Sequence, residues 1–275
     1  MKRIFFLAAL ALPLLISGCK TKEPQTAETE NTDEYKEIKN LQEDTENPDS
    51  LTEINQQYIA QPIDSIFFES CKLNPFENRD KEMAYIDPAG MGLINYYPDF
   101  YPLGWSRDGK LAYCIKQYFD GRGETLIRFI IQDTITDKII YQLDDWNCGS
   151  ISLFVANYGS DINSMIFDNK IILNRSAFNS PRDSAEFSFK IKATNFKEDE
   201  YGLKTLDYFV QAWKGNKSKI LMTKKEVPAN SVFVCGSLKS PYEDRLAIII
   251  AEVKYGFEGH DITYLISGCH TKVGF

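Results

Sequence analysis

Three runs of β-branched and aromatic residues between positions 103 and 143 limit the folds open to this chain more than any other feature. The runs cover 111–117, 125–133 and 138–143, and short turns at 120–123 and 136–137 separate them. Apolar runs bounded by Gly, Asp and Thr turns are typical of strands joined by tight hairpins. The sequence therefore predicts an antiparallel meander here.

Similar strand-like segments continue to the end of the chain, near 185–193, 204–213, 218–223, 231–236, 245–253 and 261–267. Two other segments place apolar residues at helical spacing. One follows the capping-box sequence Ser-Leu-Thr-Glu at 50–53, and the other includes Phe154, Ile162 and Ile166. We therefore expect a mainly β fold of antiparallel meanders with one or two helices, at about 51–60 and 152–169.

The segments 106–130 and 240–266 look like two copies of one unit. Each begins with a serine turn, continues into a strand containing Leu-Ala, reaches a glycine turn and ends in a second strand. The first copy, Trp105 to Tyr113, resembles the Trp-Ser-Pro-Asp-Gly-Lys-x-Ile-Ala-Tyr signature of TolB-type β-propeller repeats, with Arg107 replacing proline. The second copy keeps Ser240-Pro241 but lacks the tryptophan.

This resemblance implies propeller-like blades that form a protein-binding platform. A complete propeller needs at least four blades of roughly 40–45 residues. The alternative is two β-sheet units separated by an insertion that contains the helix, with a division near residues 150–180. The sequence leaves both arrangements open.

The first residues have the pattern of an export signal. Two basic residues at positions 2 and 3 precede an apolar run over 4–16, and Ser17 and Gly18 precede Cys19. This segment resembles the lipobox of bacterial lipoproteins, in which the cysteine is joined to diacylglycerol after cleavage before it. The alternatives are an ordinary cleaved signal, or a membrane span, for which the run is shorter than about 20 residues.

Residues 19–50 carry four lysines and ten acidic residues, with few large apolar side chains. This composition predicts a disordered acidic linker after the lipid-bearing Cys19 and before a β-rich domain over 51–275. The resemblance implies attachment to membrane lipid. Lys20, where retained enterobacterial lipoproteins have Asp, favours the outer membrane.

Charge and cysteine spacing exclude several classes of function. The chain has a net charge of −8 and no basic stripe, which argues against nucleic-acid binding. Five cysteines follow Cys19, at positions 71, 114, 148, 235 and 269, without a Cys-x-x-Cys pair. We therefore expect no metal and no cofactor, and the disulfide pairing remains open.

An aromatic cluster held by two prolines, Pro98 and Pro102, is the best candidate for a binding surface. It consists of Tyr96, Tyr97, Phe100 and Tyr101, with Trp105 close behind. Tyrosines supply contact area and a hydroxyl at low entropic cost, which suits recognition. The alternative is a loop that packs under the sheet as an edge of the core.

Two sets of residues are weaker candidates for catalysis. The carboxylate pairs Asp144-Asp145 and Glu243-Asp244, with Trp146 and Trp213 as stacking surfaces, have the residue types of a glycosidase. His260-Asp261, with Ser267 or Cys269 as nucleophile, and His270 are the other set. Chance pairing in an acidic chain explains the first set more simply, and histidines in a turn and a terminal tail explain the second.

The sequence thus favours a membrane-anchored envelope lipoprotein that acts as a non-catalytic binding or scaffolding module for an envelope protein. Its domain would face the periplasm or the cell surface. An envelope hydrolase acting on glycan or peptide is the first alternative. A solute-binding lipoprotein is the second, although the alternating α/β pattern of such proteins is missing.

Overall fold

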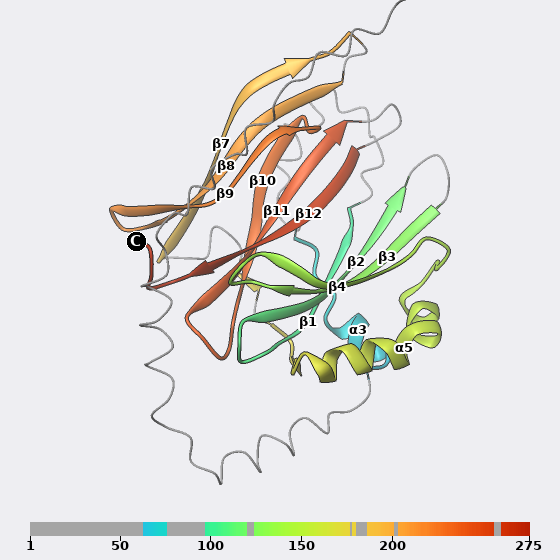
Figure 1. Cartoon of the computed structure of the whole chain (residues 1–275). Helices are drawn as coiled ribbons and strands as arrows, with labels where there is room; N and C mark the ends of the chain where they lie inside the picture. The colour runs from blue at the N-terminus through green and yellow to red at the C-terminus, as the bar shows by residue number, and fades with distance from the viewer. Residues whose placement is uncertain are drawn as a thin grey trace, which may run out of the picture. The chain divides into compact units, whose positions relative to one another are not determined.

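Antiparallel strands make up most of the structure, a computed structural model that describes residues 63–75, 97–119, 124–176, 178–179, 186–200, 203–255 and 260–275 (Figure 1). Contacts divide the chain between Ser50 and Leu51, and every element below belongs to the second unit. The helices are α3 (Ser65–Ser70) and α5 (Ile151–Asp168). The strands are β1 (Asp99–Trp105), β2 (Lys110–Phe119), β3 (Glu124–Asp133), β4 (Lys138–Asp145), β5 (Ile172–Leu173), β6 (Phe178–Asn179), β7 (Phe187–Glu198), β8 (Lys204–Lys214), β9 (Lys217–Val227), β10 (Ser231–Lys239), β11 (Arg245–Tyr255) and β12 (His260–His270).

The described strands form three sheets. Sheet A has the order β4-β3-β2-β1-β5, sheet B has the order β12-β11-β10-β6, and sheet C has the order β7-β8-β9. All of the strand pairs are antiparallel. The predicted mainly β fold with its meander over β2, β3 and β4 is therefore confirmed. Three sheets in the described chain are fewer than the four blades of the smallest propeller.

The sheets are stacked as layers with three separate apolar interfaces. One face of sheet A packs on sheet B, where Tyr113 and Ile249 share a cluster. The other face of sheet B packs on sheet C, where Ile248 and Val210 meet. The two helices cover the outer face of sheet A. Sheet B lies between sheets A and C, and the cluster between sheets A and B joins residues from both sides of positions 150–180.

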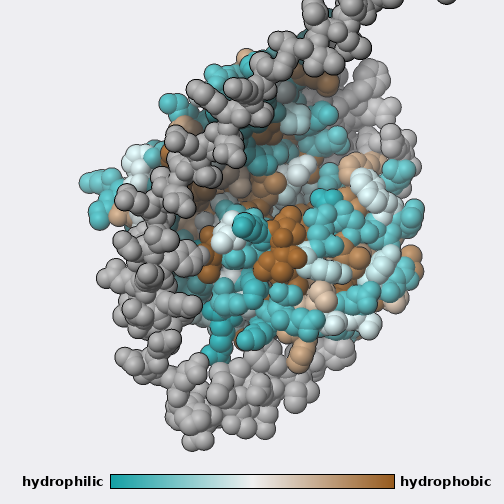
Figure 2. Space-filling view, in the orientation of Figure 1, coloured by the Kyte–Doolittle hydropathy of each residue, from teal (hydrophilic) through white to brown (hydrophobic). Residues whose placement is uncertain are grey.

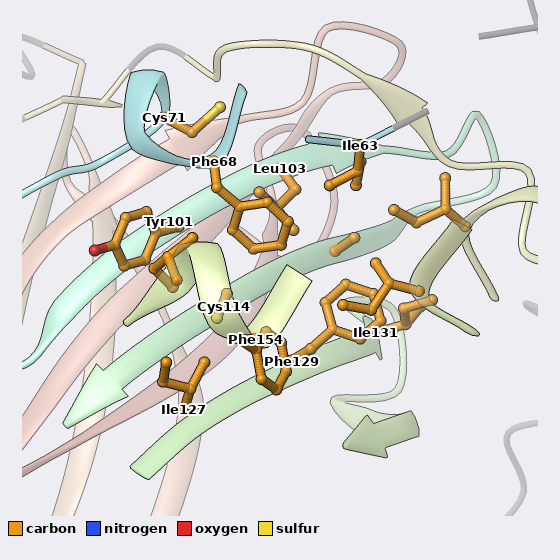
Figure 3. Close-up of a cluster of buried hydrophobic side chains, with 14 of the residues drawn as sticks. Ile63, Phe68, Cys71, Tyr101, Leu103, Cys114, Ile127, Phe129, Ile131 and Phe154 are labelled. Carbon is orange, nitrogen blue, oxygen red and sulfur yellow. The ribbon is translucent and has the colours of Figure 1, made fainter. Parts of the chain in front are cut away.

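The helices pack on sheet A through the cluster drawn in Figure 3. In α5 the buried residues Ile151, Phe154, Ile162 and Ile166 recur at helical spacing. Ser150 begins the helix, because its side chain accepts a hydrogen bond from the backbone N–H of Leu153. The predicted helix over 152–169 is confirmed, whereas the one expected at 51–60 lies outside the described residues.

A β-bulge in β1 decides which face of sheet A each aromatic side chain reaches. Phe100 packs towards sheet B and Tyr101 towards the helices, as alternation along a strand requires. The register then shifts between Pro102 and Gly104, so Trp105 faces sheet B although Leu103 faces the helices. Gly104 is required here, because a Cβ would lie 2.3 Å from the backbone oxygen of Ile172 in β5.

Both copies of the predicted repeat begin at a serine turn of an antiparallel hairpin, although the two turns differ in length. In the β1–β2 turn the Ser106 hydroxyl accepts from the N–H of Lys110 at 2.8 Å, and in the β10–β11 turn Ser240 accepts from the N–H of Tyr242 at 3.3 Å. The two turns also meet. The Arg107 guanidinium lies 5.8 Å from the centre of the Tyr242 ring. The repeat motif thus forms part of the contact between sheets A and B.

Polar groups reinforce the same contact from the β3–β4 turn. The Asp137 carboxylate accepts from the Ser267 hydroxyl at 2.8 Å and from the Gly268 N–H at 2.7 Å, both on β12. The Gln132 amide donates to the backbone oxygen of Ile266 at 2.9 Å. Sheet A is therefore held on sheet B by hydrogen bonds at one end as well as by apolar packing.

The five cysteines in the described chain are buried as free thiols, and Cys19 lies outside it. Burial raises the pKa of the thiols of Cys71, Cys114, Cys148 and Cys269. These thiols stay protonated at neutral pH and serve as small apolar groups in the core.

Candidate functional site

The predicted aromatic surface is in the core of the protein. Phe100, Tyr101 and Trp105 are at most 1% exposed, and Tyr97 is partly buried against the same cluster as Phe100. Tyr96 lies outside the described residues. Of the two arrangements that the sequence allowed, the structure places the three buried side chains at a core edge, where they offer no surface to a partner.

The carboxylates of Asp144 and Asp145 are occupied by structural contacts. Arg128, opposite Asp144 in the β3–β4 register, donates to both of its oxygens at 2.8 and 2.7 Å. Asp145 accepts from the backbone N–H of Asn147 at 2.7 Å. Trp146 stacks on Phe119 with ring centres 5.2 Å apart. These contacts hold the ends of β3 and β4 together, so the two carboxylates have a structural role.

The residues suggested for nucleophilic catalysis do not assemble either. The Ser267 hydroxyl is fully buried and donates to Asp137, while Cys269 is 1% exposed. His270 accepts at Nδ1 from the N–H groups of Lys272 and Val273, both at 3.2 Å. Desolvation and the neighbouring Arg245 and Lys219 lower the pKa of His270. The side chain of His260 lies outside the described part of the chain.

A pocket of about 430 Å³ between sheets B and C is the site that the structure itself presents. Its floor is formed by the buried residues Phe187, Ser237, Leu246 and Thr271. Its rim carries charged side chains, namely Glu186, Lys214, Lys239, Asp244 and Lys272. β6 pairs with β10 at Ser237 and Leu238, so Lys239 at the end of β10 has no described strand beside it on that edge.

Two ion pairs organise the charges at the rim. Lys214 lies 2.9 Å from Glu186 and also donates to the backbone oxygen of Thr271 at 3.1 Å. Lys272 pairs with Asp244, and this contact holds the pKa of the Asp244 carboxyl below its usual value. Lys239 is exposed and makes no ion pair with any residue that the structure describes. The rim therefore has one lysine available for an anionic group.

The chemistry of this pocket suits binding. Asp244 is ionised at neutral pH, so it is a poor general acid. Among the residues that the structure describes, no cluster of three or more His, Cys, Asp or Glu has the geometry to hold a metal ion. The volume lies within the range of about 300–1,000 Å³ found for small-molecule sites.

Sequence reasoning missed this pocket because its residues share no motif. They come from β6, β7, β8, β10, the β10–β11 turn, β11 and the segment after β12. The sequence contained one indication of the pocket. Asp244 belongs to the second copy of the repeat, and Lys239 directly precedes the first residue of that copy, Ser240. Pairing of distant strands, which the local sequence does not encode, brings these two residues to one rim.

Searches of family models, curated proteins and solved structures found no match to this chain.

Proposed function

We propose that this chain is a lipid-anchored protein of the bacterial cell envelope that binds a partner and does not catalyse a reaction. Cys19 carries the lipid, and the domain faces the periplasm or the cell surface, with the outer membrane favoured. The observation that carries the binding role is the charged pocket, in which Lys239 makes no ion pair with a described residue and lies beside two ion pairs. The partner is an envelope protein that presents an acidic group to this lysine.

The lipid anchor rests on the sequence around Cys19, because the N-terminal segment lies outside the described residues. In the described part of the chain no helix is long and apolar enough to cross a membrane. Cys19→Ser should abolish incorporation of labelled palmitate and move the protein from the membrane fraction to the soluble fraction. Cys71→Ser is the matched control and should keep the label, and labelled Cys19→Ser protein would refute the anchor.

Binding at the pocket is tested by cross-linking in living cells. A photo-reactive amino acid replaces Asn179, which lines the pocket and leaves Lys239 in place, in one strain, and Lys217, an exposed lysine at the start of β9, in a control strain. We expect one adduct of defined mass from position 179 and none from position 217. The absence of an adduct at 179, or the same adduct at both positions, would contradict a partner at this pocket.

A small solute is the second candidate, and the pocket volume of about 430 Å³ favours it. Three lysines and two acids at the rim select an anionic solute. Titration with citrate and with inorganic phosphate by calorimetry, on the wild type and on Lys239→Gln, distinguishes this case. Micromolar binding that Lys239→Gln abolishes would identify a solute site in place of a protein partner.

A further inference from the structure

The outer face of sheet C carries aromatic, basic and amide side chains that do not belong to the apolar cluster between sheets B and C. Along β8, Leu206, Tyr208 and Val210 are buried against sheet B. Phe209 and Trp213, which alternate with them, point to the opposite face and are half-buried. Sheet C is the outermost of the three layers in Figure 1, and the described strands form no further sheet on this face.

Cross-strand register shows which neighbours share the outer face. Lys190 on β7 and Ile220 on β9 lie opposite Gln211, and Lys192 lies opposite Phe209. Side chains opposite each other in an antiparallel pair lie on the same face. The Lys190 ammonium is 5.1 Å from the Trp213 ring centre, and that of Lys192 is 6.0 Å from the Phe209 ring centre. Two lysine–aromatic pairs therefore lie along one strand.

The charge of this region is opposite to that of the chain as a whole. Residues 186–227 contain nine lysines and six acidic residues, whereas the chain has a net charge of −8. Lys214, Lys219 and Lys224 face inward, where they contact Thr271, His270 and Glu252. The outer face includes Lys190, Lys192 and Asp207, and the net positive charge of these three attracts anions to it. The Trp213 Nε1–H is buried and has no hydrogen-bond partner in the described part of the chain. A ligand oxygen that moved the Lys190 side chain aside would supply the acceptor.

We propose that the outer face of sheet C binds an anionic polysaccharide, with Trp213 and Phe209 as stacking platforms and Lys190 and Lys192 as partners for its acidic groups. Phe209 and Trp213 are four residues apart on one strand, and at about 3.3 Å per residue this separates them by about 13 Å. A linear chain of sugar rings spans that distance, whereas a single small ring does not. Gln211, between the two aromatics, donates one amide N–H to the Ser218 hydroxyl at 2.7 Å and offers its second N–H to sugar hydroxyls.

The face favours a polysaccharide over a single-stranded nucleic acid, which also stacks on aromatic residues. A nucleic acid carries one charge per nucleotide and needs a strongly basic groove. Here Asp207 lies on the same face as Lys190 and Lys192, next in the alternation after Phe209. An acidic polysaccharide carries fewer charges than a nucleic acid, with carboxylates spaced among neutral hydroxyls, and this lower charge suits a face on which Asp207 offsets part of the lysine charge.

The test uses the full chain and hyaluronan, a polymer with one uronic acid per disaccharide, with tryptophan fluorescence as the readout. The chain has three tryptophans, of which Trp105 is buried and Trp146 lies on another sheet. We expect hyaluronan to change the fluorescence, Trp146→Phe to keep this response and Trp213→Phe to remove it. Lys190→Gln combined with Lys192→Gln should weaken binding at least tenfold, while Lys217→Gln changes it less than twofold.

Three outcomes would overturn the proposal. One is a response to neutral dextran equal to that to hyaluronan, since the lysines would then have no role. Another is tighter binding of oligo-dT than of hyaluronan, which would identify a nucleic-acid surface. The third is an unchanged affinity in the double lysine variant, provided that its circular dichroism spectrum matches that of the wild type. The pocket variant Lys239→Gln should leave hyaluronan binding intact, which separates this face from the pocket.

Discussion

At the scale of single residues, Gly268 on β12 lies directly against the β3–β4 turn. A Cβ there would lie 1.6 Å from the backbone oxygen of Thr134, which cannot move without displacing the β3–β4 turn. We expect Gly268→Ala to lower the free energy of unfolding by about 3 kcal/mol, the upper part of the range for overpacking. Chemical denaturation measures this loss.

Gly149 provides the control for that substitution. A Cβ on Gly149 meets no atom within 4 Å, so Gly149→Ala should change stability by less than about 0.5 kcal/mol. An equal loss in the two variants would show that the Thr134 contact is not what requires a glycine at position 268.

The lowered pKa of His270 in the folded protein makes the free energy of unfolding depend on pH. Its pKa is lowered in the folded protein, first by desolvation and then by Arg245 and Lys219, so the folded state binds a proton less readily than the unfolded chain. Stability is therefore retained above the unfolded pKa of about 6.5 and falls as the pH drops below it. His270→Asn keeps a side-chain acceptor but removes the titrating group.

The measurement compares denaturation midpoints at pH 7 and pH 5 for the wild type and His270→Asn. We expect the wild type to lose more stability than the variant between these values. Parallel losses would show that other groups produce the pH dependence.

At the scale of elements, the β3–β4 turn acts as a clip between sheets A and B. Asp137 has φ of 57° and accepts two hydrogen bonds from β12. Asp137→Gly tolerates this backbone conformation, so its effect reports the lost hydrogen bonds. We expect a loss of about 2 kcal/mol, because the Ser267 hydroxyl and the Gly268 N–H are left without their acceptor. Asp161→Ala, on the exposed face of α5, should have little effect, and an equal loss in both variants would contradict the clip.

Elements that depend on local sequence were predicted correctly. The meander over β2, β3 and β4 and the helix α5 were predicted within two residues because each depends on a local period and nearby turn residues. The bulge at Gly104 was not predicted, because it depends on the close approach of β5, about 70 residues later in the chain. That bulge turns Trp105 towards sheet B.

At the scale of the whole molecule, sheet B is shared by two of the three cores. Ile249 packs towards sheet A and Ile248 towards sheet C, and both are fully buried. Damage to either core therefore affects the other. We expect Ile249→Ala and Ile248→Ala each to cost about 2–5 kcal/mol and each to leave one cooperative transition. Far-ultraviolet circular dichroism and tryptophan fluorescence should report the same midpoint, and separate midpoints would show that the layers unfold independently.

Figure 2 shows one face of the molecule, on which the described residues are mostly hydrophilic around a hydrophobic patch near the centre.

The sequence by itself determined the class of fold, most strand positions, the helix α5 and the paired serine turns at 106 and 240, because hydrophobic period and turn chemistry are local properties. The tertiary structure decided which faces are buried. It took Phe100, Tyr101 and Trp105 into the core and brought Lys239 beside Asp244 and Glu186 at the rim of a pocket. These outcomes depend on the register and stacking of strands far apart in the chain, and burial is settled only when the layers meet.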